Sequence, residues 1–209
     1  MPEIEASLVV LGVVAVASYL LGAVPFGLVI SRLMGLGDVR KIGSGNIGAT
    51  NVLRTGSKPA ALLTLVLDGG KGAAAVLIAR ALVGEDAAQL AGFSAFLGHL
   101  YPVWLGFKGG KGVATFFGTA FALVPMVGAI AAIIWLSSAA LTRISSLSAL
   151  LAATGAPLAA LMTGNAQALV LFLAIGALIF LRHAPNIQRL LNGTEPRIGG
   201  GAGSGKESP

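Results

Sequence analysis

Two lysines in a glycine-rich segment are the strongest candidates for chemistry in this sequence. Lys108 and Lys111 lie among three glycines in residues 107–115, between long apolar runs. Glycine admits positive φ and lets a ligand approach backbone N–H groups, and Lys111 stands about where the next helix begins, where the helix dipole attracts anions. A Walker A loop requires Ser or Thr after its lysine, whereas Gly112 follows Lys111. The segment therefore predicts an anion site that is not a nucleoside triphosphate site, and a glycine-rich hinge is the alternative.

A second polar segment, residues 41–56, also carries groups that can bind an anion. Its Gly, Ser, Asn and Thr residues offer hydrogen-bond donors, and Arg54 offers a planar guanidinium that suits a phosphate. The same residue types favour turns, so this segment taken alone is equally consistent with a plain loop.

A third segment, residues 182–196, is basic and follows the last apolar run. A basic stop beside a membrane explains its arginines well, but it explains His183, Asn186 and Glu195 less well. A histidine beside a phosphate site can act as general acid, general base or charge partner. We therefore include these three residues in the candidate site.

Two ionisable residues lie inside an apolar run. Asp68 and Lys71 are three residues apart, so on a helix they share a face and can pair. An ionisable group near the middle of a membrane helix costs about 2.5 to 3.5 kcal/mol. We interpret the two as a structural pair that faces other helices, with a site near the membrane interface as the alternative.

Several familiar catalytic patterns are absent from the sequence. There is no Gly-x-Ser-x-Gly elbow, no His-x-x-x-x-Asp acyltransferase motif at His99 or His183, and no aspartate-rich metal motif. The lack of cysteine excludes disulfides, thiolate metal sites and a cysteine nucleophile. The remaining cations and donors favour direct transfer between two bound anions, and we expect neither a metal nor a cofactor.

Composition indicates a membrane protein. The sequence is 56% hydrophobic and 11% charged, with a mean hydropathy of +0.88, which is too much apolar surface for one soluble core of this length. The net charge of +6 is concentrated in loops between apolar runs, which indicates topology and anion binding instead of nucleic-acid binding. Residues 1–5 contain no Lys or Arg, so we expect a retained first span in place of a cleaved signal peptide.

The apolar runs predict an all-α integral membrane protein with seven transmembrane helices. Basic residues in 31–58 place that segment in the cytoplasm, with the N-terminus outside and the C-terminus cytoplasmic. The acidic pair Glu85 and Asp86 is expected in a short outer turn. Residues 1–198 should form one polytopic membrane domain, and residues 199–209 a disordered tail or a non-native remnant. The expected spans are 6–30, 59–84, 87–105, two short helices within 113–141 divided near Pro125, 145–162 and 166–181.

The three polar segments together resemble the motifs of the bacterial membrane family of acyl-phosphate:glycerol-3-phosphate acyltransferases. Residues 43–51 are similar to its first motif, residues 98–102 and 108–115 to its second, and residues 182–186 with Glu195 to its third. The resemblance covers nearly the whole chain, with no departure at the motif positions. Three long motifs in the right order are far more specific than any one of them.

The resemblance implies a multi-pass enzyme of the bacterial cytoplasmic (inner) membrane whose active site faces the cytoplasm. It would acylate the 1-hydroxyl of glycerol 3-phosphate from a fatty acyl phosphate, giving lysophosphatidic acid and phosphate, surrounded by membrane lipids and without an obligate protein partner. Coenzyme A and acyl carrier protein would not be direct donors. The catalytic residues implied are Ser44, Arg54, Lys111, His183, Asn186 and Glu195. The substrate-binding residues implied are Gly43, Asn46, Thr50, Asn51, Lys108, Gly109, Gly110, Gly112 and Thr115.

The residue inventory fits a simple mechanism. Acyl phosphate is already activated, so the enzyme need only align the glycerol hydroxyl with the acyl carbon and neutralise two phosphates. The departing phosphate can accept the hydroxyl proton, with His183 as the side-chain alternative. An anion transporter or lipid-handling protein is the competing class, since Gly-Gly-Lys-Gly occurs at both 69–72 and 109–112. A structural scaffold would leave the polar segments without a role.

Overall fold

The computed structural model describes residues 2–199, and all regular structure in that part of the chain is helical. Of the predicted tail, residues 200–209 lie outside the described residues. The helices are α1 (Leu8–Gly22), α2 (Phe26–Leu33), α3 (Ala49–Val52), α4 (Lys58–Leu82), α5 (Glu85–Leu100), α6 (Val113–Leu123), α7 (Pro125–Thr142), α8 (Ser145–Met162), α9 (Leu169–Arg182) and α10 (Ala184–Leu191). Short 3-10 turns are η1 (Val39–Lys41), η2 (Leu53–Thr55), η3 (Val103–Leu105) and η4 (Ala166–Ala168).

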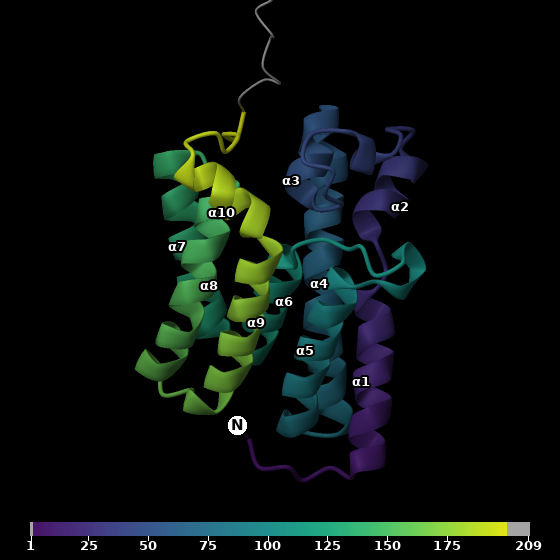
Figure 1. The fold of residues 1–209 in the computed structure, drawn as a ribbon. Coiled ribbons are helices and arrows are strands. Elements are labelled where there is room, and N and C mark those ends of the chain that lie inside the picture. Colours follow the sequence, from purple (N-terminus) through teal and green to yellow (C-terminus); the bar gives the residue numbers. More distant parts are fainter. Residues whose placement is uncertain (1, 200–209) are drawn as a thin grey trace, which may run out of the picture.

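The long helices form two groups that α6 joins. Helix α5 packs against both α1 and α4, while α8 packs against both α7 and α9. Helix α6 contacts α4 on one side and α7 on the other, and it lies between the two groups in Figure 1. The N-terminus lies at one end of the bundle, whereas α2, α3 and α10 lie at the opposite end (Figure 1). The segments around 41–56 and 182–196 are therefore gathered at the same end.

Four helical stretches are long and apolar enough to cross a membrane. They are Leu8–Leu33, Lys58–Leu82, Pro125–Thr142 and Ser145–Met162, and the chain from Ala166 to Leu191, bent by 63° at its break, makes a fifth if counted as one span. Helix α6 is apolar but shorter, with 11 residues. The division of 113–141 into two helices near Pro125 is confirmed. The count of seven spans and their orientation stay predictions.

Two of the expected spans have different boundaries. The run 6–30 is interrupted, because α1 ends at Gly22 and α2 begins after Pro25, whose backbone has no N–H to continue a helix. The run 87–105 is a shorter helix that begins at Glu85 and ends at Leu100. Glu85 and Asp86 thus lie in the first turn of α5, where the helix dipole favours acids, and not in a separate outer turn.

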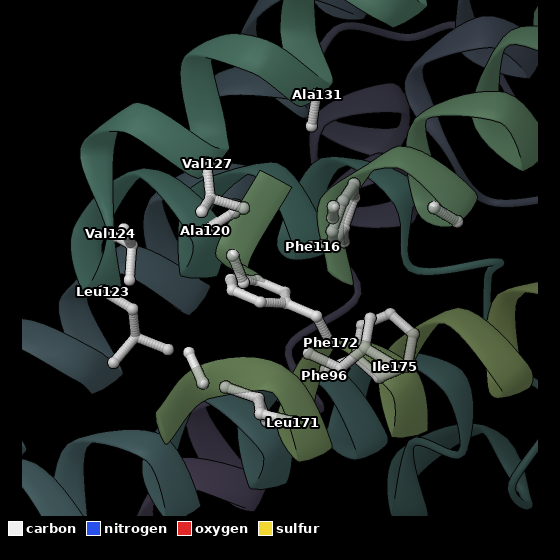
Figure 2. Close-up of a cluster of buried hydrophobic side chains, with 14 of the residues drawn as sticks. Phe96, Phe116, Ala120, Leu123, Val124, Val127, Ala131, Leu171, Phe172 and Ile175 are labelled. Carbon is white, nitrogen blue, oxygen red and sulfur yellow. The ribbon is translucent and has the colours of Figure 1, made fainter. Parts of the chain in front are cut away.

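Aromatic side chains fill the core where the two groups of helices meet. Phe96 of α5, Phe116 of α6 and Phe172 of α9 are almost fully buried and lie together in Figure 2. The rings of Phe116 and Phe172 meet edge to face, with centroids 6.5 Å apart. Their packing joins the C-terminal part of α5 to the first turns of α6 and α9.

Glycine lets neighbouring helices approach closely, as is common in membrane bundles. A Cβ at Gly22 or Gly98 would collide with the backbone of α5 or α1 respectively, and one at Gly118 would collide with the backbone at Gly69 of α4. These contacts hold α1 against α5 and α4 against α6.

Asp68 and Lys71 form the predicted pair. The Lys71 Nζ lies 2.9 Å from Asp68 Oδ1, and each side chain is only 2% exposed. The Gly-Gly-Lys-Gly run at 69–72 is part of α4, whereas the run at 109–112 is a loop. The two runs therefore do not form a structural repeat.

Candidate functional site

Lys111 and the third polar segment meet directly. The Lys111 ammonium donates a hydrogen bond to Asn186 Oδ1 on α10, and Asn186 Nδ2 donates to Glu195 Oε1 at 2.6 Å. The loop that carries Lys111 connects α5 to α6 and crosses α4 in Figure 1. Residues far apart in sequence thus form one chain of contacts from a cation to a carboxylate.

Glu195 is the anchor of this network. Its Oε1 also accepts a hydrogen bond from the Ser146 hydroxyl at 2.7 Å, and its Oε2 accepts from Arg189 Nε at 2.7 Å. Burial alone would raise the pKa of Glu195, but the hydrogen bonds from Ser146, Asn186 and Arg189 together lower it below its usual value. Glu195 is therefore an anion at neutral pH, and it can orient Asn186 and Lys111 but is poorly suited to donate a proton.

Lys111 is a partly buried cation at the start of α6. Gly112, with φ of 80°, forms the N-cap of that helix and turns the chain into it. Burial is the main cause that lowers the pKa of Lys111 to about 8. The positive charges of Arg189, Arg54 and Arg182 also lower this pKa, whereas the negative charge of Glu195 raises it. The ammonium is mostly charged at neutral pH and is easily neutralised in mild alkali. A phosphate next to it would stabilise the charged form.

The glycines before Lys111 are held tightly by the protein. The N–H groups of Gly109 and Gly110 donate to the carbonyls of Leu100 and His99, each at 3.1 Å. The Arg182 guanidinium donates to the carbonyls of Gly110 and Gly109, at 3.1 and 2.8 Å. These two amides are already paired, so the expectation of free N–H groups for an anion is not met there. Both glycines serve close packing of the loop instead.

Two other predicted binding residues of this segment lie apart from the Lys111 network. Lys108 is exposed, next to η3. Thr115 is fully buried, and its hydroxyl donates to the Asp68 carbonyl at 2.9 Å. The structure gives Thr115 a packing position between α6 and α4, and its contact with substrate stays a prediction.

Asn51 organises the first polar segment. Its side chain is nearly buried, and its Nδ2 donates to the carbonyls of Val39, Ile42 and Asn46 at 2.7, 3.2 and 2.8 Å. Its Oδ1 accepts from the Ser44 amide at 3.0 Å and from Arg54 Nη1 at 3.2 Å. Asn51 therefore shapes the loop that presents Ser44 and Arg54.

The exposed residues of the first segment are the ones able to meet a ligand. Ser44 and Arg54 are exposed, and Gly43, with φ of 53°, lies so close to Arg54 that a Cβ there would collide with its side chain. The Thr50 and Ser145 hydroxyls lie 3.4 Å apart, which links this segment to the start of α8. Ser145 precedes the Glu195 partner Ser146, so all three predicted segments reach one region.

His183 lies at the junction of α9 and α10 and is buried. Its Nδ1 lies 2.8 Å from the Ile179 carbonyl, an oxygen that can only accept a hydrogen bond. In the neutral imidazole the proton is therefore assigned to Nδ1, which leaves a lone pair on Nε2. Such a histidine can accept a proton at Nε2 or can simply fix the turn into α10.

Three side chains of the network were not predicted from the sequence. Ser146 belongs to the first turn of an ordinary apolar helix, and nothing near it in the sequence marks it. Arg182 and Arg189 are members of the third segment, but their number suggested a basic stop and not contacts with Gly110 and Glu195. Residues 2–199 contain no group of three or more His, Cys, Asp or Glu placed to hold a metal.

Comparison with known proteins gives a consistent result. Residues 12–193 match the family model described as glycerol-3-phosphate acyltransferase. A glycerol-3-phosphate acyltransferase of Cereibacter sphaeroides (strain ATCC 17025) is 64% identical over 95% of each chain, and one of Jannaschia sp. (strain CCS1) is 63% identical over 95% of this chain and 98% of its own. The crystal structure of PlsY (YgiH), an integral membrane glycerol 3-phosphate acyltransferase, in its glycerol 3-phosphate form is similar with a TM-score of 0.86. It is 42% identical and covers 90% of this chain and 96% of its own, and its lysophosphatidic acid form gives a TM-score of 0.84.

Proposed function

The chain belongs to the glycerol-3-phosphate acyltransferase family, and we propose that its acyl donor is a fatty acyl phosphate. The protein is an integral membrane acyltransferase with an all-helical fold. In this proposal the 1-hydroxyl of glycerol 3-phosphate receives the acyl group, and the products are lysophosphatidic acid and inorganic phosphate. Family membership supports this proposal, and so does the resemblance of the three polar segments to the motifs of acyl-phosphate-dependent enzymes.

The contact chain from Lys111 through Asn186 to Glu195 is the observation that carries this proposal. It joins cationic and hydrogen-bonding groups from two predicted motifs, and Ser145 brings in the first motif through Thr50. A site rich in cations and without cysteine suits acyl transfer from an acyl phosphate, which is a mixed anhydride, to the hydroxyl of a phosphate ester. The activated donor does not require a nucleophile from the protein.

The reaction balances without a covalent enzyme intermediate. The 1-hydroxyl oxygen bonds to the acyl carbon, the bond from that carbon to the phosphate oxygen breaks, and the hydroxyl proton moves to the departing phosphate. The lone pair on His183 Nε2 is the side-chain alternative for that proton. Lys111, Arg54 and Ser44 would hold the phosphates, each charge-assisted hydrogen bond contributing about 1.5 to 3 kcal/mol.

We further propose that the enzyme lies in the bacterial inner membrane with this site toward the cytoplasm. The basic residues of 31–58 and 182–197 support that orientation by the positive-inside rule, and α2, α3 and α10 lie at the same end of the bundle. The sequence contains no cysteine, so single cysteines at Glu3 and Asn192 can report topology without background labelling. A membrane-impermeant maleimide should label Glu3→Cys from outside intact cells and Asn192→Cys only after lysis. The reverse pattern would overturn the orientation.

The donor is tested with purified wild-type protein in detergent or vesicles. Palmitoyl phosphate and glycerol 3-phosphate together should give lysophosphatidic acid and an equal amount of inorganic phosphate, and either one alone should give neither product. Palmitoyl coenzyme A or palmitoyl acyl carrier protein should not replace the acyl phosphate. Acyl transfer from a thioester at a comparable rate would refute the proposed donor, and movement of glycerol 3-phosphate across vesicles without acylation would favour a transporter.

A further inference from the structure

Three ionisable side chains form a buried cluster that the proposed reaction does not use. Asp68 and Lys71 of α4 are paired, and His99 of α5 points Nδ1 at the same Asp68 oxygen, 3.5 Å away. All three side chains are at most 4% exposed. Ionisable residues inside a membrane bundle are costly to bury and usually have a role. The cluster therefore calls for a function beyond the pairing of two charges.

His99 is the point at which this cluster touches the Lys111 loop. Its carbonyl accepts the Gly110 N–H, and a Cβ at Gly110 would collide with its Nε2. The imidazole thus lies against the backbone one residue before Lys111, while its other nitrogen faces Asp68. Any displacement of the His99 ring would therefore also displace the Lys111 loop.

Arg182 holds the same loop through different atoms. Its guanidinium donates to the carbonyls of Gly109 and Gly110 and lies over the Tyr101 ring, 5.5 Å from the centroid. Amide and carbonyl groups of both glycines are therefore fixed by the protein. A loop that is held through both its amide and its carbonyl groups can keep Lys111 in one position.

Lys71 connects the cluster to the other side of the site. Its Nζ donates to the Val24 carbonyl at 2.9 Å, at the break between α1 and α2 where Pro25 interrupts the helix. Helix α2, which follows the break, packs against the first polar segment so closely that a Cβ at Gly27 would collide with the Ile47 carbonyl. The cluster thus reaches the second segment through His99 and the first segment through the helix break.

We propose that Asp68, Lys71 and His99 are positioning residues for the phosphate site. Asp68 orients His99, His99 fixes the Lys111 loop, and Lys71 fixes the α1–α2 break. None of the three needs to touch a substrate. This inference rests on the proposed function only in that a phosphate binds near Lys111, and it does not depend on the identity of the acyl donor.

Two variants separate positioning from simple stability. Asp68→Asn removes the charge that faces His99, and His99→Phe keeps a ring beside Gly110 but removes Nδ1. Arg80→Gln is the matched control, because Arg80 lies on the same helix and binds the Ala122 and Leu123 carbonyls at the far end of the bundle. Each protein is compared by its elution profile and Tm in detergent, by the Kd for glycerol 3-phosphate and by kcat/KM.

Positioning predicts a loss of kcat/KM of roughly 10- to 100-fold in both variants, since small displacements of a binding group cost rates of this order. The Kd for glycerol 3-phosphate should rise about tenfold in both variants. The Tm of His99→Phe should be no lower than that of Arg80→Gln, whereas Asp68→Asn should also lower the Tm because it leaves Lys71 without its counter-charge. The loss in the double variant should be smaller than the product of the two single losses, because part of the effect of Asp68 acts through His99. If Asp68→Asn does not elute as a single species, His99→Phe alone carries the test.

Two results would overturn the proposal. One is a lowered Tm with Kd and kcat/KM within about threefold of the wild type, which is the pattern expected of a purely structural pair. The other is a double variant whose loss equals the product of the two single losses. A wild-type protein that binds glycerol 3-phosphate but does not use palmitoyl phosphate would instead contradict the proposed donor and leave the positioning test intact.

Discussion

Replacement of Glu195 by Gln tests how the anchor controls Lys111. The substitution keeps the size of the side chain but places a neutral amide where a carboxylate accepts from Ser146, Asn186 and Arg189. At least one of the amide hydrogens must face an existing donor. The perturbation therefore loosens Asn186 and removes the negative charge that supports the ammonium of Lys111.

The size of the effect follows from the contacts. A hydrogen bond to a charged group contributes about 1.5 to 3 kcal/mol. The bond from Asn186 Nδ2 to Glu195 Oε1 is only partly buried, so we take the low end of that range, about 1.5 kcal/mol. If the variant loses most of this hydrogen-bond energy, Asn186 and Lys111 are no longer held in position. The value of kcat/KM should then fall about tenfold, since about 1.4 kcal/mol corresponds to a factor of ten.

The pH dependence gives a second, independent readout. In the proposed mechanism Lys111 binds a phosphate as the ammonium, so kcat/KM of the wild type should decline as the pH rises through the Lys111 pKa of about 8. Glu195 raises that pKa, and without its charge the pKa must be lower, so the decline should begin at a lower pH in Glu195→Gln. The assay is kcat/KM for glycerol 3-phosphate between pH 6 and 9.5 at fixed acyl phosphate. A variant within twofold of the wild type, with an unchanged alkaline limb, would refute the reasoning.

Three further predictions follow from single contacts. Lys111→Arg keeps a cation that does not titrate below about pH 12, so its rate should be lower but its alkaline limb above pH 8 should be absent in the same pH series. Gly110→Ala should lower kcat/KM at least tenfold, because the new Cβ collides with His99, whereas Gly70→Ala, which meets no atom within 4 Å, should leave kcat/KM unchanged and not lower the Tm. His183→Gln should lose most activity if Nε2 takes the hydroxyl proton, and a near-normal rate in a phosphate-release assay would remove His183 as the base.

The sequence was a good guide to residues whose chemistry is visible in their own segment. Lys111, Asn186 and Glu195 were predicted from residue type and motif, and the structure joins them in one network. The prediction of an all-helical membrane enzyme of this acyltransferase family is confirmed. Hydrophobic runs and polar loops are local properties of the chain, which is why they could be recognised without coordinates.

Contacts between distant segments could not be predicted in this way. His99 was not included in the candidate site because no acidic residue follows it in the sequence, whereas the carboxylate near its ring is Asp68 on a different helix. Ser146 gave no signal because its partner Glu195 lies beyond two further helices. Thr115 was predicted to contact substrate from its place in a motif; its hydroxyl is buried against the Asp68 carbonyl of α4, and the substrate contact stays a prediction. Pairings of this kind depend on how helices pack, which one sequence does not reveal.

The predicted helix boundaries were wrong where a single residue outweighed the hydrophobic pattern. Pro25 ends the regular helix within a run that is long enough for one span, and Lys71 satisfies the carbonyl left at the break. Glu85 and Asp86 looked like an outer turn because they are charged, but Gly84 precedes them as the N-cap and they form the first turn of α5.

The central claim is that Lys111 holds a substrate phosphate, and one comparison tests it most directly. The initial rate with palmitoyl phosphate and glycerol 3-phosphate is measured for wild type, Lys111→Ala and Lys58→Ala, the last removing an exposed lysine at the start of α4 that makes no contact with the network. We predict that Lys111→Ala loses at least 100-fold in kcat/KM, about 2.7 kcal/mol, while Lys58→Ala stays near the wild type. A Lys111→Ala enzyme within a few-fold of the wild type would contradict the account.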